Sequence, residues 1–275
     1  MKLLLLIPTY NNAATVCDIV CRSVAVWSEV LVVDDGSTDD TLSRLHALQQ
    51  DTRFEILTYP KNRGKGGALK AGFQWAKDHG YTHVLTLDAD GQHYPEDAPA
   101  LIEASRQQPN ALIVGSRSFT DKNMQGGSVF ANKFSNFWFT VQTLRRIPDT
   151  QTGYRLYPLD GIGGLRVLTA RYEAELELLV FTAWRGTPIV PVPVRVYYPA
   201  PEDRVTHFRP TLDFLRITIL NTILCFLAIV YGGPRMLIHY IKTKPHPLPP
   251  SPKGEGEAYG RKNKKIIFSP FIFHF

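Results

Sequence analysis

The chain is 275 residues long, with 44% hydrophobic and 20% charged residues, a composition that supports one large core or a core with a small appendage. Its net charge of +6 is concentrated: residues 242–275 hold seven Lys or Arg and two Glu, a charge of +5, which leaves +1 for the other 241 residues. A nucleic-acid groove needs positive charge on the folded body, so nucleic acid is excluded as an expected partner. The three cysteines fit neither a zinc site nor an even disulfide framework, which indicates a reducing, cytosolic setting.

The first 115 residues alternate short apolar runs with stretches in which apolar residues recur at helical spacing. The runs have the length and composition of strands covered on both faces. They lie at residues 3–7, 30–33, 54–58, 84–87 and 112–115. This alternation predicts an α/β fold with a mostly parallel central sheet, in which ligands bind at the carboxyl ends of the strands.

Between residues 131 and 200 the pattern predicts an aromatic-rich helix, a loop at 148–158, a second helix and one more strand. The second helix is expected over residues 172–185 and is closed by Gly186. The strand, 189–198, is expected at an edge of the sheet, because Pro191 and Pro193 cannot donate ladder hydrogen bonds. Residues 1–200 are therefore predicted to form one domain.

Two further segments complete the predicted organisation. Residues 201–241 contain a basic loop (203–210) and an apolar stretch (212–231) interrupted by an aspartate, an arginine and an asparagine. The uninterrupted part is shorter than the ~20 residues that a spanning helix needs, which favours an amphipathic helix in a membrane interface over a membrane span or a core helix. Residues 242–275 are rich in Pro, Gly and charge, and are expected to be a disordered tail.

Chemistry-bearing residues follow the strand predicted at 84–87. Asp88 and Asp90 are separated by one residue and are followed by Gln92 and His93. Carboxylate and amide oxygens are the ligands that Mg²⁺ or Mn²⁺ prefers, and such an ion pairs naturally with a diphosphate. The alternative is an Asp-rich turn that only caps the next helix.

Two other loops carry similar signals. Asp34 and Asp35 follow the second strand, where a carboxylate can accept hydrogen bonds from ribose hydroxyls or a base N–H, although this could be an ordinary turn. The segment NRGKGGAL (62–69) places Lys65 among glycines before a helix, so it could approach phosphates or simply lead into the helix. Its order is not that of a P-loop, and no G-x-G-x-x-G follows the first strand, which argues against an ATPase or a dinucleotide-binding enzyme.

Taken together, these motifs resemble the family 2 glycosyltransferases, which have a Rossmann-like GT-A domain. The resemblance covers residues 3–200 and rests on the order IPTYNN, VVDDGSTDDT, NRGKGGAL, LDADGQHYPED. Gly115-Ser116-Arg117 and DTQTGYR (149–155) are most similar to the branch that makes polyprenyl-phosphate mannose or glucose.

The resemblance implies roles for the donor-side residues. Those implied for the nucleotide are a base pocket (Pro8, Thr9, Tyr10), a base or ribose contact (Asp35, with Asp34 nearby) and a nearby cation (Lys65). Asp88 would contact the sugar or ribose and join Asp90 and Gln92 around the metal. Asn12 stands where the family has an acidic residue, so the choice between GDP and UDP stays open.

On the acceptor side, the resemblance implies that Arg117 and Arg155 face phosphates, and Asp149 is the candidate for taking up a proton. Glu173 and Glu177 share one face of the predicted helix and are expected to be solvated. Arg204, in the basic loop, is a candidate clamp for an acceptor phosphate.

These expectations define an inverting, metal-assisted glycosyltransferase at the cytoplasmic face of a membrane, using a GDP- or UDP-sugar and a polyprenyl or other lipid phosphate. Three alternatives stay open. A sugar-nucleotide nucleotidyltransferase would need a Gly-rich basic loop where the chain has PTYNN. A sugar-nucleotide sensor would not need both Asp88 and Asp90. A related glycosyltransferase could use a soluble sugar hydroxyl.

Overall fold

The computed structural model describes residues 1–117, 126–162, 169, 171, 173–198 and 210–243. All of them except Thr243 belong to one compact unit, Met1–Lys242. The predicted tail and the basic loop with Arg204 lie outside the described residues.

Seven strands form one sheet in the order β3-β2-β1-β4-β6-β5-β7. The neighbouring pairs are parallel except those made by β6, which runs antiparallel to β4 and β5. The strands are β1 (Leu3–Thr9), β2 (Val30–Asp34), β3 (Glu55–Thr58), β4 (His83–Thr86), β5 (Leu112–Arg117), β6 (Arg155–Pro158) and β7 (Ile189–Val194). The predicted mostly parallel α/β sheet is confirmed, and the proline-containing strand β7 lies at its edge. The loop predicted at 148–158 is wrong at its end, because residues 155–158 form the additional strand β6 inside the sheet.

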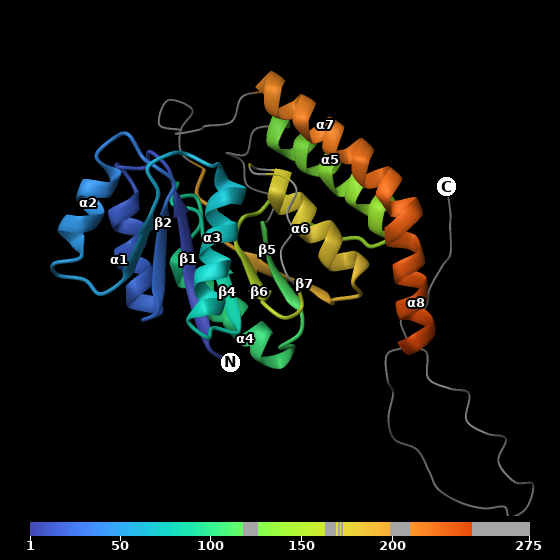
Figure 1. Cartoon of the computed structure of the whole chain (residues 1–275), viewed down its shortest axis with the longest axis horizontal. Helices are drawn as coiled ribbons and strands as arrows, with labels where there is room; N and C mark the ends of the chain where they lie inside the picture. Colours follow the sequence, from blue (N-terminus) through green and yellow to red (C-terminus); the bar gives the residue numbers. More distant parts are fainter. Residues whose placement is uncertain (118–125, 163–168, 170, 172, 199–209, 244–275) are drawn as a thin grey trace, which may run out of the picture. The chain divides into compact units, whose positions relative to one another are not determined.

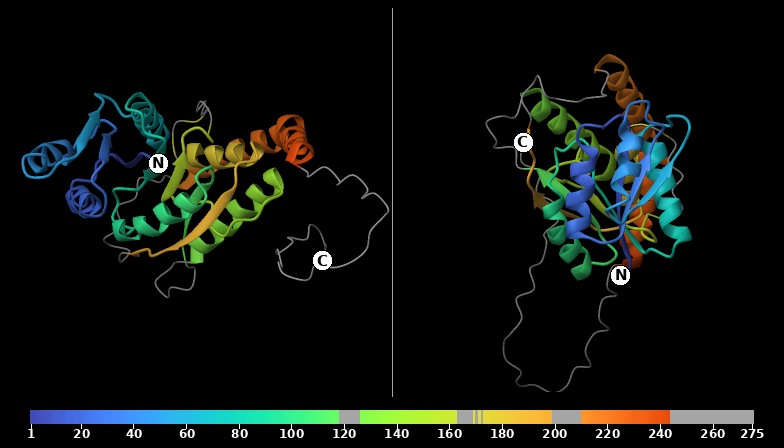
Figure 2. Two further views of the ribbon diagram at one scale, coloured as in Figure 1. Left: turned by 90° about the horizontal axis from the view of Figure 1, so that it is seen from below. Right: turned by 90° about the vertical axis from the view of Figure 1, so that its left-hand side faces the viewer.

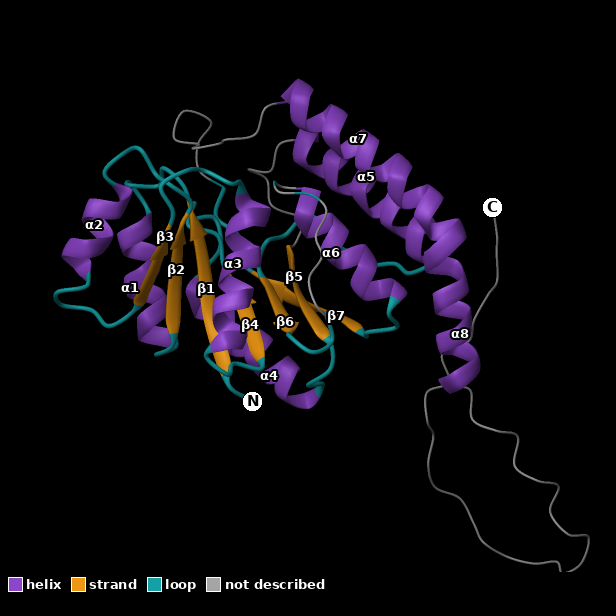
Figure 3. Ribbon diagram, viewed as in Figure 1, coloured by secondary structure: helices purple, strands orange, loops and turns teal. Residues whose placement is uncertain are grey.

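Helices connect the strands and extend the chain beyond the sheet (Figures 1 and 3). They are α1 (Val16–Val26), α2 (Thr41–Leu48), α3 (Lys65–Asp78), the 3-10 turn η1 (Pro95–Asp97), α4 (Ala98–Gln107), α5 (Gly126–Thr143), α6 (Glu173–Trp184), α7 (Pro210–Leu227), the π-helical segment η3 (Ala228–Gly232) and α8 (Gly233–Thr243).

Strand β1 shows why the sheet is covered on both faces. Its side chains alternate between two cores, as the two-residue period of a strand requires. Leu4 and Leu6 pack with α3 and α6 on one face, and Leu3, Leu5 and Ile7 pack with α1 and α4 on the other (Figure 2). A continuous apolar run such as LLLLI is therefore buried in full.

The reversed direction of β6 positions the functional loops. A parallel strand ends at the carboxyl edge of the sheet, whereas an antiparallel strand begins there. Arg155 at the start of β6 is paired with Thr86 near the end of β4, and also with Val114 of β5. The loop of residues 148–154 therefore lies at the carboxyl edge of the sheet, where it meets the loop after β4 and the end of β5.

The C-terminal helices differ from the expectation. Leu220 and Leu224 of α7 are buried in the main core, and Gln142 of α5 donates a hydrogen bond to Asn221 of α7 (Nε2–Oδ1, 2.9 Å). The helical run continues through η3 and α8, so Leu215–Thr243 spans 29 residues. Its apolar 18-residue window has a mean hydropathy of 1.9, and 22% of that window is buried. The predicted apolar stretch is thus not too short: by length and composition alone, the run could cross a membrane.

The packing of α3 on β1 generates the first prediction. A methyl group at Gly72 would overlap the side chain of Leu6, which is fully buried in β1. We expect Gly72→Ala to lower the free energy of unfolding by about 1–3 kcal/mol, because extra volume in a close-packed core forces strain. Urea unfolding measures this change.

The double variant Gly72→Ala with Leu6→Ala serves as the control. Removing the Leu6 side chain makes room for the added methyl group. The loss of unfolding free energy in the double variant should therefore be smaller than the sum of the losses in Gly72→Ala and Leu6→Ala. Strict additivity would contradict the proposed contact.

Candidate functional site

The loop after β4 brings two carboxylates to the carboxyl edge of the sheet. Asp90 accepts a hydrogen bond from the backbone N–H of Gln92 (Oδ1–N, 2.9 Å), which fixes its carboxylate within the turn. The carbonyl of Gln92 accepts the N–H of Tyr197 (2.8 Å), and His93 forms a bridge with Val196. The segment after β7 therefore holds this loop in place.

Lys65, the first residue of α3, reaches into the same loop. Its Nζ lies 2.7 and 2.9 Å from the two carboxylate oxygens of Asp88 and 2.9 Å from Oε2 of Glu175, on α6. Burial alone would lower the pKa of Lys65, but the two carboxylates outweigh it and raise the pKa. The same ammonium lowers the pKa of Asp88 against the opposing effect of burial. Both groups are therefore ionised near neutral pH.

Asp90 and His93 have shifted pKa values. Burial, followed by the negative charge of Asp88, raises the pKa of Asp90 to about 6. Burial lowers the pKa of His93 to about 4, so its imidazole is neutral at pH 7 and contributes no positive charge to the site. The carboxylate loop consequently keeps a negative charge that Lys65 only partly offsets.

This loop fits a hard divalent cation. Asp88, Asp90 and Gln92 supply carboxylate and amide oxygens, and the raised pKa of Asp90 shows a carboxylate that a nearby positive charge would stabilise. Within the described residues, no three Asp, Glu, His or Cys side chains converge as a ready-made metal cluster. Both oxygens of Asp88 instead face Lys65.

Asp34 and Asp35 connect the end of β2 to the loop of residues 62–65. Asp35 accepts the backbone N–H groups of Arg63 (2.8 Å) and Gly64 (2.7 Å), and Asp34 accepts the hydroxyl of Thr58 (2.9 Å). Both carboxylates are buried. Their visible role is thus to fasten the 62–65 loop to the end of β2, and so to aim Lys65.

The three residues implied for the base pocket lie at the end of β1. Pro8 and Thr9 are buried, Tyr10 is half-buried, and the carbonyl of Thr9 accepts the N–H of Asp35 (2.9 Å). The structure therefore brings this group next to the Asp34–Asp35 turn.

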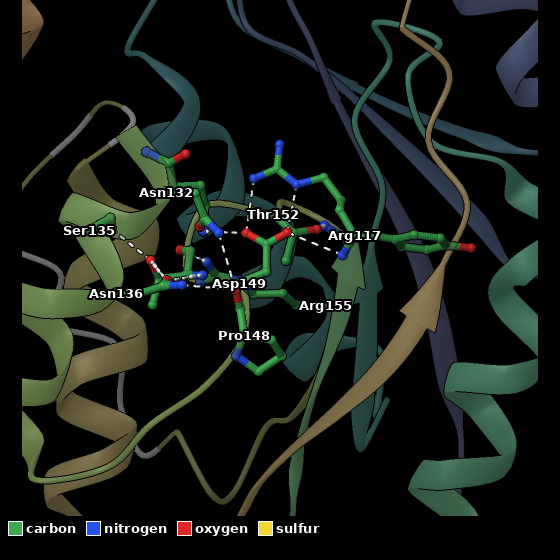
Figure 4. A network of polar contacts seen from close by, with 11 residues as sticks. Arg117, Asn132, Ser135, Asn136, Pro148, Asp149, Thr152 and Arg155 are labelled. Carbon is green, nitrogen blue, oxygen red and sulfur yellow. Dashed lines mark hydrogen bonds and ion pairs between the residues drawn. The ribbon is translucent and has the colours of Figure 1, made fainter. Parts of the chain in front are cut away.

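Arg117 and Asp149 form the second charged pair at this edge (Figure 4). Arg117 Nε lies 2.6 Å from Oδ2 of Asp149, and Nη2 lies 2.9 Å from Oδ1. Asp149 is 0% exposed, and the hydrogen bonds and charge of Arg117 lower its pKa although burial acts to raise it. An ionised, fully enclosed carboxylate is a poor proton acceptor, so Asp149 fits the positioning of Arg117 better than the predicted base role.

Helix α5 holds the loop that carries Asp149. The amide groups of Asn132 and Asn136 donate to the carbonyl of Pro148 (3.1 and 2.8 Å), and Oδ1 of Asn136 accepts the N–H of Thr150 (3.1 Å). These bonds fix the backbone on both sides of Asp149, as Figure 4 shows.

Arg155 does not face a phosphate-binding surface, contrary to the implied role. Its side chain is 0% exposed, and its terminal nitrogens donate to the carbonyls of Glu175 (2.7 Å) and Thr150 (2.8 Å). Arg155 therefore connects α6 to the 148–154 loop through these two hydrogen bonds.

The glutamates of α6 also differ from the expectation. Every residue of α6 except Phe181 is buried, so Glu173 and Glu177 are not solvated. Glu177 accepts two hydrogen bonds from Thr169, through its backbone N–H and its hydroxyl (3.0 and 2.7 Å). Glu175, from the same acidic run, is the one that reaches Lys65. The sequence feature that points to this contact is a set of three acidic residues at the start of an otherwise apolar helix.

Comparisons with known proteins agree with this fold. The family model described as glycosyl transferase family 2 matches residues 5–156, more than half of the chain. An undecaprenyl-phosphate mannosyltransferase of Micrococcus luteus is 30% identical, over 70% of this chain and 83% of that protein. A polyprenol monophosphomannose synthase of Mycolicibacterium smegmatis is 32% identical, over 70% and 76%.

Among solved structures, glucosyl-3-phosphoglycerate synthase of Mycobacterium tuberculosis, in complex with Mn²⁺, UDP and phosphoglyceric acid, superposes with a TM-score of 0.60. It is 18% identical and covers 84% of this chain and 78% of that one, a likeness of fold alone. The family match and the identity to the two polyprenyl-phosphate enzymes together place the chain in glycosyltransferase family 2, with a GT-A fold.

Proposed function

We propose that this enzyme transfers a sugar from a nucleoside diphosphate sugar to a polyprenyl phosphate, with inversion at the sugar and with the assistance of Mg²⁺ or Mn²⁺. One observation carries the proposal. A single edge of the sheet presents a carboxylate loop suited to a metal-bound diphosphate, and beside it an arginine held by a carboxylate and suited to a second phosphate.

On the donor side, Asp88, Asp90 and Gln92 would hold the divalent cation. Such an ion neutralises charge that builds on a departing nucleoside diphosphate. Asp35 positions the loop that carries Lys65, and the end of β1 (Pro8, Thr9, Tyr10) would receive the base. The choice between GDP and UDP is left to measurement.

On the acceptor side, Arg117 would bind the acceptor phosphate. Asp149 holds its guanidinium through a bidentate contact, which fixes the plane of the group. An ionised phosphate needs no strong base to attack, which agrees with an Asp149 that is already fully paired. Direct attack from the face opposite the leaving group inverts the sugar. Arg204 is proposed as a further phosphate contact.

The lipid part of the proposal is supported by the relatives and by α7. The names of the two bacterial relatives are those of polyprenyl-phosphate enzymes. Leu215, Ile219, Ile223 and Phe226 recur at helical spacing on α7 and are between 46% and 64% exposed. We infer that this apolar stripe contacts a membrane at its cytoplasmic face, where reduced cysteines and soluble nucleotide sugars are compatible.

A second candidate is transfer to a soluble phosphorylated acceptor. The superposed synthase contains phosphoglyceric acid, and Arg117 could serve such a phosphate equally well. The apolar stripe on α7 favours the lipid, because a soluble acceptor gives no reason to expose it.

Asp90→Asn tests the metal assignment. Turnover should fall at least about 100-fold, because the cation would lose a charged ligand and the leaving group its electrostatic support. In wild type, Mn²⁺ binding in the presence of GDP or UDP should weaken as pH falls through about 6, where a proton competes for Asp90. The variant should lack this pH dependence.

Asp78→Asn is the matched control, since Asp78 is exposed at the end of α3 and contacts only Gln74 in the described structure. It should leave turnover and the pH profile unchanged. Near wild-type turnover in Asp90→Asn would overturn the metal assignment.

Paired substitution of Phe226→Glu and Ile229→Glu tests the membrane contact. These side chains are exposed at the end of α7 and in η3, and carboxylates there should reduce binding to phosphatidylcholine–phosphatidylglycerol vesicles about tenfold or more. Gln74→Glu with Gln107→Glu adds the same charge on exposed positions of α3 and α4, and should reduce vesicle binding much less. Equal losses in a flotation assay would show that only net charge matters.

A further inference from the structure

The ammonium group of Lys65 lies between two carboxylates that come from different elements. Asp88 follows β4 and Glu175 lies in the first turn of α6, yet Nζ is within 2.9 Å of both. The remaining oxygen of Glu175, Oε1, is buried and has no hydrogen-bond partner among the described residues. Burial raises the pKa of Glu175, and the positive charges of Lys65 and Arg155 oppose that rise.

The surroundings leave Lys65 little room to move away. A side chain at Gly153 would overlap Oδ2 of Asp88 and lie 2.8 Å from Nζ of Lys65, so the backbone of the 148–154 loop covers the ion pair directly. The hydroxyl of Thr86 holds that backbone through the carbonyl of Gly153 (2.7 Å). The ammonium of Lys65 is therefore held in a fixed position beside Asp88.

The position of Lys65 conflicts with a cation at Asp88. Asp88 and Glu175 both contact the ammonium of Lys65, and the negative charge of Asp88 also acts on Asp90. The buried guanidinium of Arg155 is a second positive charge that acts on Asp88 and Glu175. A divalent cation at Asp88 and Asp90 would have to share Asp88 with Lys65, and the two positive charges repel at this distance. A nucleoside diphosphate adds negative charge that relieves this repulsion.

We propose that Lys65 is a resident counter-ion that keeps the affinity of the metal site low until a nucleoside diphosphate binds, and that the carboxylate of Glu175 limits this effect by offsetting part of the charge of Lys65. Metal and nucleotide would then bind cooperatively, with each raising the affinity of the other by the same factor. This inference rests on the proposed function, because it assumes the cation at Asp88 and Asp90. It predicts that Lys65 lowers the affinity of the site for the metal and that Glu175 raises it.

The test is Mn²⁺ binding, measured by electron paramagnetic resonance of the free ion, without nucleotide and with GDP or UDP. Wild type should bind Mn²⁺ weakly alone and more tightly with at least one nucleotide. Lys65→Met should bind Mn²⁺ alone about tenfold more tightly or better, because the competing charge is gone, and should gain less from nucleotide. Glu175→Gln should bind Mn²⁺ alone more weakly than wild type.

Matched controls change the same charges on exposed helix positions. Lys70→Met lies on α3, as does Lys65, and Glu103→Gln lies on α4; neither should alter Mn²⁺ affinity beyond the small effect of net charge. Lys65→Arg, which keeps the charge, should retain weak binding. Because Lys65→Met leaves two carboxylates unpaired, its melting temperature should rise more with Mn²⁺ than that of wild type.

The outcomes separate the two proposals. If wild type binds Mn²⁺ with a nucleotide but Lys65→Met binds Mn²⁺ alone no better than wild type, the counter-ion proposal is overturned and the metal assignment stands. Loss of Mn²⁺ binding in both Lys65→Met and Glu175→Gln would equally overturn it, since both residues would then be merely structural. If wild type binds no Mn²⁺ even with GDP or UDP, the metal part of the proposed function fails, and the counter-ion proposal with it.

Discussion

A buried ion pair between α3, the loop after β4 and α6 is the constraint on which the site depends. Carboxylates taken out of water are costly unless they are paired, so Asp88 and Glu175 need the ammonium of Lys65 between them. That requirement sets where α3 begins, how the 62–65 loop is fastened by Asp35, and how closely the 148–154 loop packs. The donor side of the site is consequently a single electrostatic unit.

The acceptor side follows from the direction of one strand. Because β6 runs antiparallel to its neighbours, the loop before it meets the end of β5, and Asp149 can form an ion pair with Arg117. This pair carries no net charge, whereas the carboxylate loop remains negative. A phosphate placed at Arg117 would therefore lie next to a cation-binding site without competing for it. In the proposed function, the negative loop would serve the donor and the Arg117–Asp149 pair the acceptor.

The sequence predicted six of the seven strands and the motif positions, because a buried strand must be a short apolar run and ligand loops follow such strands. It predicted β7 at the edge from Pro191 and Pro193 alone. It missed β6, because RLYP (155–158) is too short and too polar at its start to stand out from the loop predicted at 148–158, and so it could not reveal the direction of that strand. It therefore could not show that Arg155 is a buried brace or that Asp149 is closed off by Arg117, and it placed Glu173 and Glu177 in solvent because helical spacing does not identify what packs on a face.

The most direct test of the account is a transfer assay with purified protein, labelled GDP- and UDP-sugars, Mn²⁺, and either polyprenyl phosphate in detergent or 3-phosphoglyceric acid. The account predicts that at least one labelled sugar enters the polyprenyl phosphate, that chelation of the metal abolishes this transfer, and that Arg117→Met reduces it while nucleotide binding survives. Transfer only to the soluble acceptor would contradict the lipid assignment. Undiminished transfer without a divalent cation would contradict the role given to the carboxylate loop.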